Sequence, residues 1–376
     1  MSVIPRQRIV IAMYDGLGLD YLESSPMPAL KEMMTQGLFK PVSAVFPTVT
    51  NANNVSICCG TWPKEHGITG NSYYNEVTGE ADYMEHAAFV RQPTIIQRAA
   101  MQGVPAALLT CKVKTINLLA PGAALAVAAE RPPDKFVRRY GPPPGIYSRE
   151  INYWLWRVAI DLLKNWPEIG LLYIHTTDYP MHTWAPHEAE SQAHLAELDR
   201  LLGEARDVAP DAAFYITADH GMNYKRRCWD LMRACHERGL ELRFALSAEK
   251  DRYVKHHRTF GGAAWVWLRS PADAQEAIEM IAALDGVEAV LTRDEAAARF
   301  QLMPERIGQL VVLGDHETVF GELDTAMEVL DQRYRSHGSL HESAIPLVIF
   351  DPKGGLPPAE TLKANVDLTR LLFRAS

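Results

Sequence analysis

Short apolar runs alternate with amphipathic segments along the first 220 or so residues of the chain. The apolar runs predict buried strands over 8–13, 40–46, 105–110, 170–175 and 212–217. Helical periodicity predicts helices over 27–36, 94–102, 150–165 and 187–207. Strands that alternate with helices in this way predict an α/β fold, in which helices cover both faces of a mostly parallel sheet.

The pattern changes after Tyr224. Strands are predicted over 262–269, 286–292 and 308–314, and helices over 272–284 and 294–300. We interpret this part as a small βαβ-like unit inserted into the main pattern, which resumes with a strand over 344–350 and a helix over 367–373. The predicted domains are therefore a core, residues 1–223 and 335–376, and an inserted α+β cap, residues 224–334.

The overall charge limits the classes of partner. The chain has 376 residues, of which 47% are hydrophobic, and a formal net charge of −8. This charge argues against binding to nucleic acid or to an anionic membrane surface. An anionic substrate would need local positive charge, from metal ions or from a few lysines. The oligomeric state is left open, with a homodimer as one form.

The cysteines and the first residues indicate the compartment. The five cysteines are odd in number and lack zinc-type C-x-x-C pairs, so we interpret them as reduced, mostly buried thiols. The sequence shows no signal-peptide pattern, and no apolar run reaches about 18 residues. The predicted location is the cytoplasm.

The stretch from Phe46 to Gly60 is the centre of the chemical prediction. It turns through Pro47 and opens a short helix, with Thr50 at or just before the helix N-terminus. Unpaired N–H groups and the helix dipole at such an end favour an anion. The Thr50 hydroxyl would then face a phosphoryl group. Taken alone, a threonine at this position is usually only a helix cap.

Asp and His residues follow the predicted strands at several points. They are Asp15, Asp178, His182, Asp219, His220 and His337. Because ligands bind at the carboxyl ends of the strands in an open parallel sheet, we expect these residues to gather at one edge. Three carboxylates and three imidazoles suit two divalent ions with open positions, Zn²⁺ best, with Mn²⁺ or Fe as alternatives.

Each piece of this set also has a simpler interpretation. Asp15-Gly16 after a strand is most often a turn, and Asp178 with His182 is explained by a helix cap and a surface histidine. Asp219-His220-Gly221 is more specific, because a strand seldom ends in two polar residues without a reason. Only the full set, in this order around a parallel sheet, favours the metal site.

With these motifs in place, the sequence resembles the alkaline phosphatase superfamily, in its nucleotide pyrophosphatase/phosphodiesterase-like branch. Within that branch it is most similar to the phosphonoacetate hydrolases, zinc enzymes that split a carbon–phosphorus bond to give acetate and phosphate. The matching stretches cover nearly the whole chain: 50–54 (TNANN), 66–71 (HGITGN), 176–179 (TTDY), 217–223 (TADHGMN), 286–293 (GVEAVLTR), 306–308 (RIG) and 335–338 (RSHG).

The resemblance implies a role for each matched residue. One zinc ion would bind Asp178, His182 and His337. A second would bind Asp15, Asp219 and His220, together with the oxygen of the nucleophile Thr50, and the reaction would pass through a phosphothreonine. Asn71 would donate its side-chain amide to a phosphoryl oxygen. Lys112 and Lys114 would hold the substrate carboxylate, with Lys225 as a weaker third candidate.

The two lysines have a physical argument of their own. Lys112 and Lys114 are two residues apart after a predicted strand, so they would project to the same side at the metal edge. They would supply positive charge for a small phosphonate that carries a carboxylate. The simpler interpretation is a pair of solvated lysines.

The chain also departs from the family pattern. Pro180 and Trp184 beside the metal ligands are unexpected, and so is His175, which we interpret as a supporting or core residue. Substrate identity is therefore less well defined than the chemistry. A phosphodiesterase, nucleotide pyrophosphatase or phosphomonoesterase on the same metal core is the alternative, and a non-catalytic metal-binding protein is a remote one.

Overall fold

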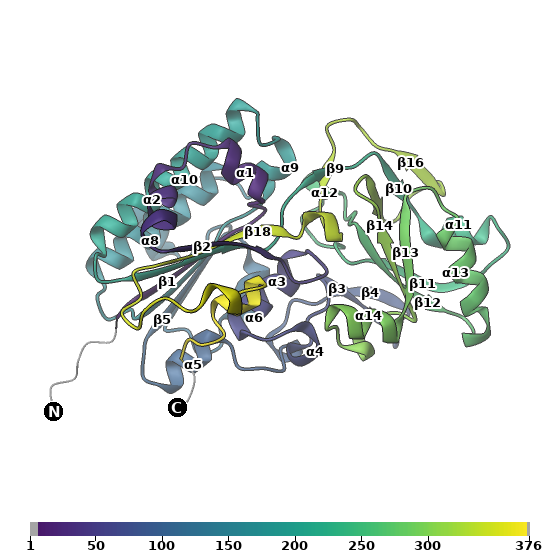
Figure 1. Cartoon of the computed structure of the whole chain (residues 1–376), viewed down its shortest axis with the longest axis horizontal. Helices are drawn as coiled ribbons and strands as arrows, with labels where there is room; N and C mark the ends of the chain where they lie inside the picture. The colour runs from purple at the N-terminus through teal and green to yellow at the C-terminus, as the bar shows by residue number, and fades with distance from the viewer. Residues whose placement is uncertain (1–6, 374–376) are drawn as a thin grey trace.

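The computed structural model describes residues 7–373, so the outermost residues of the predicted core segments, 1–6 and 374–376, lie outside it. A large sheet occupies one half of the molecule and smaller sheets occupy the other (Figure 1). The strands of the large sheet run in the order β2-β18-β8-β1-β7-β5-β6. Their bounds are β1 (Ile9–Tyr14), β2 (Leu38–Ser43), β5 (Ala106–Thr110), β6 (Leu125–Ala128), β7 (Leu171–His175), β8 (Ala213–Ala218) and β18 (Ala344–Phe350).

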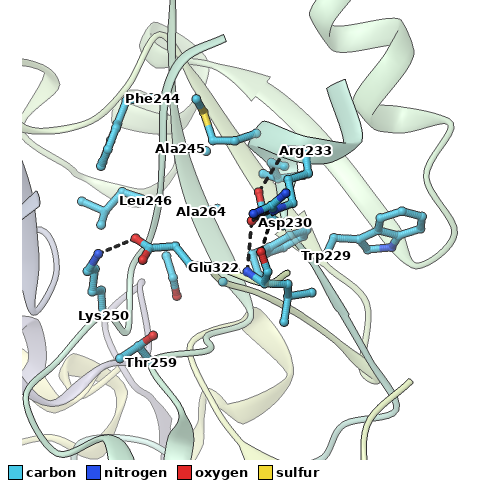
Figure 2. A pocket seen from close by; sticks show the side chains of 16 residues that line it. Trp229, Asp230, Arg233, Phe244, Ala245, Leu246, Lys250, Thr259, Ala264 and Glu322 are labelled. Carbon is cyan, nitrogen blue, oxygen red and sulfur yellow. Dashed lines mark hydrogen bonds and ion pairs between the residues drawn. The ribbon is translucent and has the colours of Figure 1, made fainter. Parts of the chain in front are cut away.

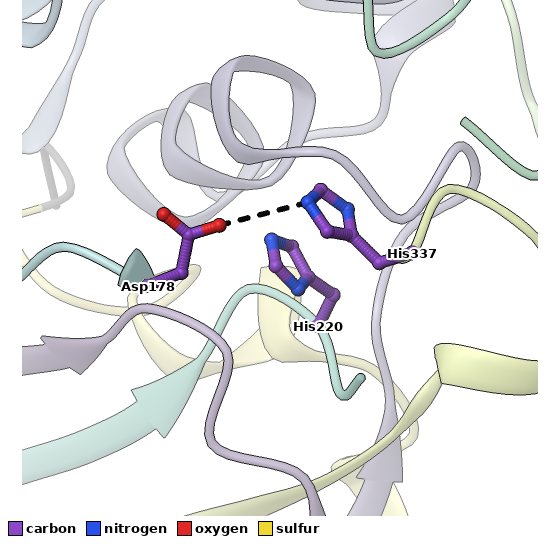
Figure 3. Close-up of side chains that lie close together, drawn as sticks. All are labelled: Asp178, His220 and His337. Carbon is purple, nitrogen blue, oxygen red and sulfur yellow. Dashed lines mark ion pairs between the residues drawn. The ribbon is translucent and has the colours of Figure 1, made fainter. Parts of the chain in front are cut away.

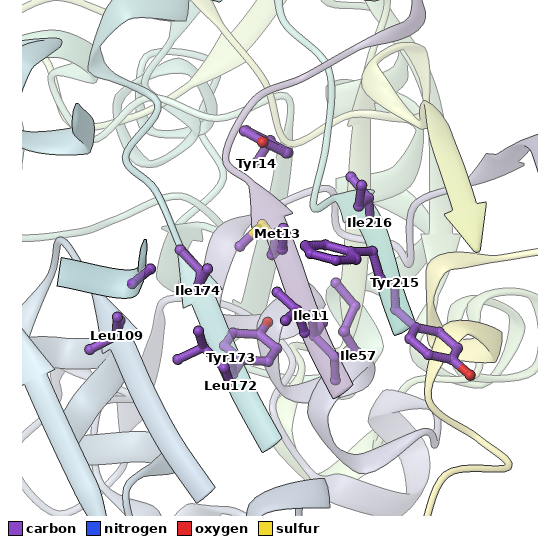
Figure 4. Packing of buried hydrophobic residues seen from close by; sticks show 14 of the residues in the cluster. Ile11, Met13, Tyr14, Ile57, Leu109, Leu172, Tyr173, Ile174, Tyr215 and Ile216 are labelled. Carbon is purple, nitrogen blue, oxygen red and sulfur yellow. The ribbon is translucent and has the colours of Figure 1, made fainter. Parts of the chain in front are cut away.

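The predicted, mostly parallel sheet is confirmed. Strands β8, β1, β7, β5 and β6 are parallel neighbours, whereas β18 pairs antiparallel with both β8 and β2. The central strands are buried on both faces, which explains why their sequences are nearly continuous apolar runs. Figure 4 shows side chains of this core, among them Ile11, Tyr173 and Ile216 from three adjacent strands and Ile57 from a helix below them.

Helices form a layer on each side of this sheet (Figure 1). One layer contains α1 (Leu19–Ser24), α2 (Pro28–Gln36), α8 (Glu150–Asn165) and α10 (Ala189–Val208), and the other contains α3 (Thr50–Cys59), α5 (Ile95–Met101) and α6 (Val113–Leu119). All ten residues of α3 are buried, so its N-terminus lies inside the protein rather than in solvent. All five cysteines are buried free thiols. Within residues 7–373, no helix has the length and apolarity needed to cross a membrane.

The second half of the molecule contains a four-stranded antiparallel sheet, in the order β11-β12-β14-β13. Its strands are β11 (Leu242–Ser247), β12 (Ala263–Leu268), β13 (Val287–Thr292) and β14 (Leu310–Gly314), and α11 (Leu231–His236), α13 (Ala274–Ala282) and α14 (Arg293–Phe300) accompany them. The strands and the helix of the predicted βαβ-like unit, β12, α13 and β13, are present, but the two strands are not neighbours in the sheet. β14 lies between β12 and β13 and runs antiparallel to both, so the two strands joined by α13 do not pair.

Shorter elements complete the fold. The hairpin β3 (Ser72–Asn75) and β4 (Glu80–Tyr83) packs on the antiparallel sheet through Tyr74, whose ring contacts Phe244 and Trp267. The small sheets β15-β10-β16 and β17-β9 use β9 (Asn223–Tyr224), β10 (Arg227–Trp229), β15 (Thr318–Phe320), β16 (Met327–Val329) and β17 (Arg335–Ser336). The remaining α-helices are α4 (Pro63–His66), α7 (Asp134–Tyr140), α9 (Tyr179–Thr183) and α12 (Val254–His257).

Two local predictions are wrong. The helix predicted over 367–373 is a short 3₁₀ turn, Asn365–Leu368, followed by further turns. Side-chain hydrogen bonds hold this segment instead, because Asn365 Nδ2 donates to Asn53 Oδ1 of α3 at 2.8 Å. The strand predicted over 40–46 ends at Ser43, since the backbone N–H of Val45 leaves the sheet and donates to Asn53 Oδ1.

Candidate active site

The carboxyl ends of three adjacent strands bring the predicted aspartates together. Asp15 follows β1, Asp178 follows β7 and Asp219 follows β8, and β1 pairs with both neighbours. All three side chains are buried. The turn after β1 depends on Gly16, whose positive φ of 79° suits glycine and whose N–H donates to Asp219 Oδ1 at 3.0 Å.

The predicted histidines reach the same place from other segments. His182 lies on α9, whose N-cap is Asp178, and its Nε2 is 2.9 Å from Asp178 Oδ2. His220 follows Asp219 directly, and its Nε2 lies 3.5 Å from Asp15 Oδ1. His337 follows β17, and its Nε2 lies 3.6 Å from Asp178 Oδ2. Asp178 and His182 are four residues apart, so one helical turn brings the carboxylate and the imidazole together.

The three histidines share one hydrogen-bonding arrangement. Nδ1 of each faces a backbone carbonyl: Arg335 for His182, Gly221 for His220 and Thr48 for His337, at 2.8, 2.9 and 2.7 Å. A carbonyl only accepts, so Nδ1 carries a proton in each ring, and in the neutral rings of His220 and His337 Nε2 keeps its lone pair. These two Nε2 atoms are therefore free to bind a metal ion, in the way that metal-ligating histidines are usually held.

The pKa values of His220 and His337 agree with neutral imidazole rings at these two positions. Burial, followed by the effect of His337, lowers the pKa of His220 to about 3. Burial likewise lowers the pKa of His337. Both rings are therefore neutral at pH 7, and metal binding requires the neutral form.

The pKa values of Asp15 and Asp219 are shifted in opposite directions. Burial and the nearby Asp15 raise the pKa of Asp219 well above its usual value. Burial and Asp178 also act to raise the pKa of Asp15, but Lys112 and His175 outweigh them and lower it. Neighbouring carboxylates in a buried place repel one another unless cations compensate them.

Several buried atoms of the cluster have no hydrogen-bond partner among the described residues, and their chemistry indicates which ligand would balance the negative charge of the carboxylates. Four buried atoms have no hydrogen-bond partner: Asp15 Oδ1, Asp219 Oδ2, His220 Nε2 and His337 Nε2. All four are electron-pair donors, whereas each carboxylate's other oxygen accepts hydrogen bonds from the protein. Buried polar atoms without partners are rare in proteins, so this donor set fits divalent cations.

Figure 3 shows how closely residues predicted for different ions approach. Ligand atoms of Asp178, His220 and His337 lie within 4.8 Å of one another. The rings of His220 and His337 stack with centroids 3.5 Å apart. Asp15, His175 and Asp219 form an adjoining group of the same kind. The predicted ligands thus form one continuous cluster, and their division between two ions stays a prediction.

Thr50 and Asn71 lie beside this cluster. Thr50 is the first residue of α3 and is 1% exposed, as predicted for the helix N-terminus. Two residues before it, the carbonyl of Thr48 accepts the hydrogen bond from His337, which connects the start of α3 to the predicted ligand cluster. Asn71 Oδ1 accepts from the backbone N–H of Asn51 at 3.0 Å, so the Asn71 amide lies at the same helix end.

Lys112 and Lys114 are both buried at this site, but not as the spacing predicted. Lys112 is the N-cap of α6 and Lys114 lies in its first turn, so the two lysines do not extend a strand. Both ammonium groups nevertheless contact the ring of Tyr253. The Nζ atom lies 5.7 Å from the ring centre for Lys112 and 5.5 Å for Lys114. Lys112 Nζ bonds Asp15 at 2.8 Å and Asp178 at 3.0 Å, and Lys114 bonds Asp251.

Lys225 lies elsewhere. Its ammonium donates to Glu342 at 2.8 Å and to the carbonyl of His316 at 2.9 Å, and its side chain is fully buried. None of these partners belongs to the predicted site. The ion pair joins β17-β9 to the turn before β18, which is a structural role.

Comparison with known proteins identifies the family. A sequence model described as type I phosphodiesterase / nucleotide pyrophosphatase matches residues 9–339. The chain belongs to this family. The resemblance to the alkaline phosphatase superfamily is thereby confirmed.

Solved structures agree with the family and extend the likeness. Phosphonoacetate hydrolase from Sinorhizobium meliloti 1021, in complex with phosphonoformate, has a TM-score of 0.87 and 30% identity, covering 98% of this chain and 95% of that chain. The complex of that enzyme with phosphonoacetate gives the same values. Murine ectonucleotide pyrophosphatase/phosphodiesterase 5 has a TM-score of 0.71 at 16% identity, which shows a shared fold.

Named sequence relatives are phosphodiesterases of greater length. Venom phosphodiesterase of Macrovipera lebetinus is 28% identical over 226 residues, which are 57% of this chain and 25% of that protein. Ectonucleotide pyrophosphatase/phosphodiesterase family member 7 of Rattus norvegicus is 23% identical over 232 residues, 58% of this chain and 50% of that protein. The chain therefore spans between a quarter and a half of the length of these relatives.

One loop beside the cluster was not predicted from the sequence. Residues 248–262, between β11 and β12, bring buried acidic and imidazole groups against the cluster. Glu249 Oε1 lies 3.7 Å from His337 Nε2, and His256 Nε2 lies 3.8 Å from Asp178 Oδ1. The only local signal was the pair of adjacent histidines at 256 and 257, which no strand or helix pattern places near Asp178.

His175 supports the site as predicted. Its Nε2 lies 3.2 Å from Asp15 Oδ2, and its Nδ1 lies 3.1 and 3.2 Å from the hydroxyls of Thr110 and Thr115. A cavity of about 410 Å³ in the other half of the molecule contains none of the predicted residues (Figure 2). Its charged groups pair with one another, Lys250 with Glu322 and Arg233 with Asp230.

Proposed function

We propose that this protein hydrolyses the carbon–phosphorus bond of phosphonoacetate to give acetate and phosphate, with two divalent cations, Zn²⁺ foremost. The observation that carries the proposal is the pair of buried ammonium groups of Lys112 and Lys114 beside the ligand cluster. Two cations there suit a substrate that carries a carboxylate next to its phosphonate. The similarity to phosphonoacetate hydrolase over 98% of the chain supports the same conclusion.

The residues that would hold the ions are those predicted from the sequence. Asp178, His182 and His337 would bind one ion, and Asp15, Asp219 and His220 the other. When bound, two divalent ions supply positive charge that lowers the pKa of a hydroxyl and neutralises phosphoryl oxygens. The orphaned oxygens and Nε2 atoms described above provide the required electron pairs.

Thr50 would be the nucleophile. Its hydroxyl gives up its proton to solvent, and Oγ forms a bond to phosphorus while the phosphorus–carbon bond breaks on the opposite side, which gives a phosphothreonine. The N–H groups at the start of α3 and the Asn71 amide would donate to the phosphoryl oxygens. Water then cleaves the phosphothreonine and releases phosphate.

The two lysines would stabilise the leaving group. The electron pair of the broken bond moves to carbon and into the neighbouring carboxylate, as an enolate-like acetate that takes a proton from water. Carbon is a poor leaving group unless this charge is stabilised. Hydrogen bonds from a charged donor contribute about 1.5–3 kcal/mol each, so each lysine would accelerate this step.

Phosphate release from a panel of substrates tests the proposal. Zinc-loaded protein is given phosphonoacetate, phosphonopyruvate, 2-aminoethylphosphonate and a nucleotide diester, and phosphate or nucleotide is measured. Phosphonoacetate should give the highest kcat/KM. A flat or reversed ranking would contradict the assignment to phosphonoacetate while leaving the metal chemistry in place.

A phosphodiesterase or nucleotide pyrophosphatase on the same residues is the second candidate, and the match of the family over residues 9–339 favours it. It would hydrolyse bis(p-nitrophenyl) phosphate faster than phosphonoacetate. It would also lose little activity when both lysines are replaced. The inserted cap of residues 224–334, the cytoplasmic location and the homodimer stay predictions.

A further inference from the structure

A cavity of about 480 Å³ opens beside the two lysines. Its wall includes Lys114, Tyr147 and Tyr253, with Arg131 and Arg252 among the other lining residues. Sites for drug-sized ligands have volumes of about 300–1,000 Å³. The cavity is therefore much larger than the acetate part of phosphonoacetate requires.

The cavity borders side chains that lie close to the ligand cluster, and Lys114 itself is part of its wall. The Tyr253 ring contacts the ammonium groups of both Lys112 and Lys114, and Lys112 bonds Asp15 and Asp178. On another side, the Tyr147 ring lies 5.6 Å from that of His256, whose Nε2 lies 3.8 Å from Asp178. A substrate held at the lysines would thus border the cavity.

The two glutamates that line the cavity already have hydrogen-bond or ion-pair partners in the protein. Glu130 accepts hydrogen bonds from the backbone N–H of Val113 and from the Tyr253 hydroxyl, the latter at 2.6 Å. Glu85 is paired with Arg252, with Nε and Oε2 2.9 Å apart. Burial also raises the pKa of Glu85, against the opposing effects of Lys114 and Arg252.

The remaining cation has no such partner. Arg131 is exposed at the cavity, and its guanidinium makes no hydrogen bond or ion pair with the residues that the structure describes. Among the described residues, Arg131 is thus an unpaired cation at the cavity wall, in a chain whose net charge is −8. An arginine fork matches a carboxylate with two parallel hydrogen bonds.

We propose that this cavity holds a side chain on the carbon next to phosphorus, so that the substrates include 2-substituted phosphonoacetates whose side chain ends in a carboxylate bound by Arg131. This inference rests on the proposed function. The first carboxylate stays at Lys112 and Lys114 and accepts the electron pair of the breaking bond. The side chain takes no part in the bond changes.

The chemistry balances as it does for phosphonoacetate. Thr50 loses its hydroxyl proton to solvent and Oγ bonds to phosphorus, while the phosphorus–carbon bond breaks and its electron pair moves to carbon 2 and into the attached carboxylate. Carbon 2 then takes a proton from water, and a water molecule cleaves the phosphothreonine and restores the threonine hydroxyl. The net reaction adds one water and gives phosphate and the substituted acetic acid.

Three matched phosphonates test the inference. The wild-type protein is loaded with zinc and given phosphonoacetate, 2-phosphonopentanedioate and 2-phosphonopentanoate, and phosphate release gives kcat/KM for each. The last two have side chains of similar length, but only the pentanedioate carries the second carboxylate. We expect the pentanedioate to exceed the pentanoate by about fivefold or more, the ratio that corresponds to ~1 kcal/mol.

The Arg131→Gln variant tests whether Arg131 causes the preference for the pentanedioate over the pentanoate. In this variant the ratio between the two substituted phosphonates should fall to about one. Arg138→Gln, at another exposed arginine of the neighbouring helix α7, should keep the wild-type ratio.

The outcomes separate the inference from the proposed function. If phosphonoacetate is hydrolysed but the two substituted phosphonates differ by less than twofold, the inference is wrong and the proposed function stands. The same holds if Arg131→Gln keeps the wild-type ratio. If none of the three phosphonates is hydrolysed, the proposed function is wrong and the inference fails with it.

Discussion

His337 Nδ1 donates a hydrogen bond of 2.7 Å to the backbone carbonyl of Thr48. This contact joins a predicted metal ligand to the turn that precedes the predicted nucleophile, across 289 residues of sequence. It also leaves the lone pair of His337 Nε2 free to face the cluster. The contact therefore links the segment that leads into Thr50 to one predicted metal ligand.

Replacement of Thr50 tests its role as nucleophile. Thr50→Ala should reduce phosphate release from phosphonoacetate to background, because no other hydroxyl at the start of α3 replaces Oγ. Thr50→Ser should keep a measurable part of the activity. Mass spectrometry of acid-quenched wild-type protein should find 80 Da of added mass on the peptide with Thr50, as a phosphoryl group adds. Unchanged phosphate release by Thr50→Ala would exclude this mechanism.

Replacement of Lys114 tests recognition of the carboxylate. Lys114→Met should lower kcat/KM for phosphonoacetate about 10- to 100-fold, which corresponds to the ~1.5–3 kcal/mol of a hydrogen bond to a charged group. Hydrolysis of p-nitrophenyl phosphate, which has no carboxylate, should change much less. Lys164→Met, at an exposed lysine of α8, serves as the control. Equal losses on both substrates would indicate a general structural role for Lys114.

The pH dependence of stability provides a test away from the metal ligands. Burial, with a smaller effect of Arg306, lowers the pKa of His66 to about 3 in the folded protein, below its ordinary value of 6.5. The unfolded chain therefore binds more protons between these pH values, and stability falls as the pH drops through 6.5 towards 3.

Urea unfolding of zinc-free protein at pH 7 and pH 5 measures this effect. His66 alone should account for ~2 kcal/mol of the loss in free energy of unfolding between the two pH values. His66→Gln should show a smaller loss by about that amount, although it will be less stable at pH 7. His187→Gln, at an exposed position, should behave as the wild type. A His66→Gln protein with the wild-type pH dependence would refute the assignment.

Much of the core was predictable because its signals are local. An aspartate follows β1 and β8 directly and β7 after two threonines, and parallel strands bring their carboxyl ends to one edge. The i, i+4 spacing of Asp178 and His182 was equally readable. These predictions needed only the period of a strand or a helix.

The rest depends on contacts between distant segments. The loop 248–262 reaches Asp178 and His337 only because of how the antiparallel sheet docks on the core. The insertion of β14 between β12 and β13 has no signal in the hydrophobic pattern of either strand. The start of α6 at Val113 was missed because Lys112 and Lys114 also fit the end of a strand.

The most direct test of the central claim is the number of zinc ions bound per chain. Zinc-loaded protein is dialysed free of excess metal, and zinc is measured by mass spectrometry against protein concentration. We predict two ions for the wild type, a loss of about one ion in His337→Ala, and no loss in His341→Ala, whose ring bonds Glu288 outside the cluster. Fewer than one zinc ion in the wild type, or equal losses in the two variants, would contradict the account.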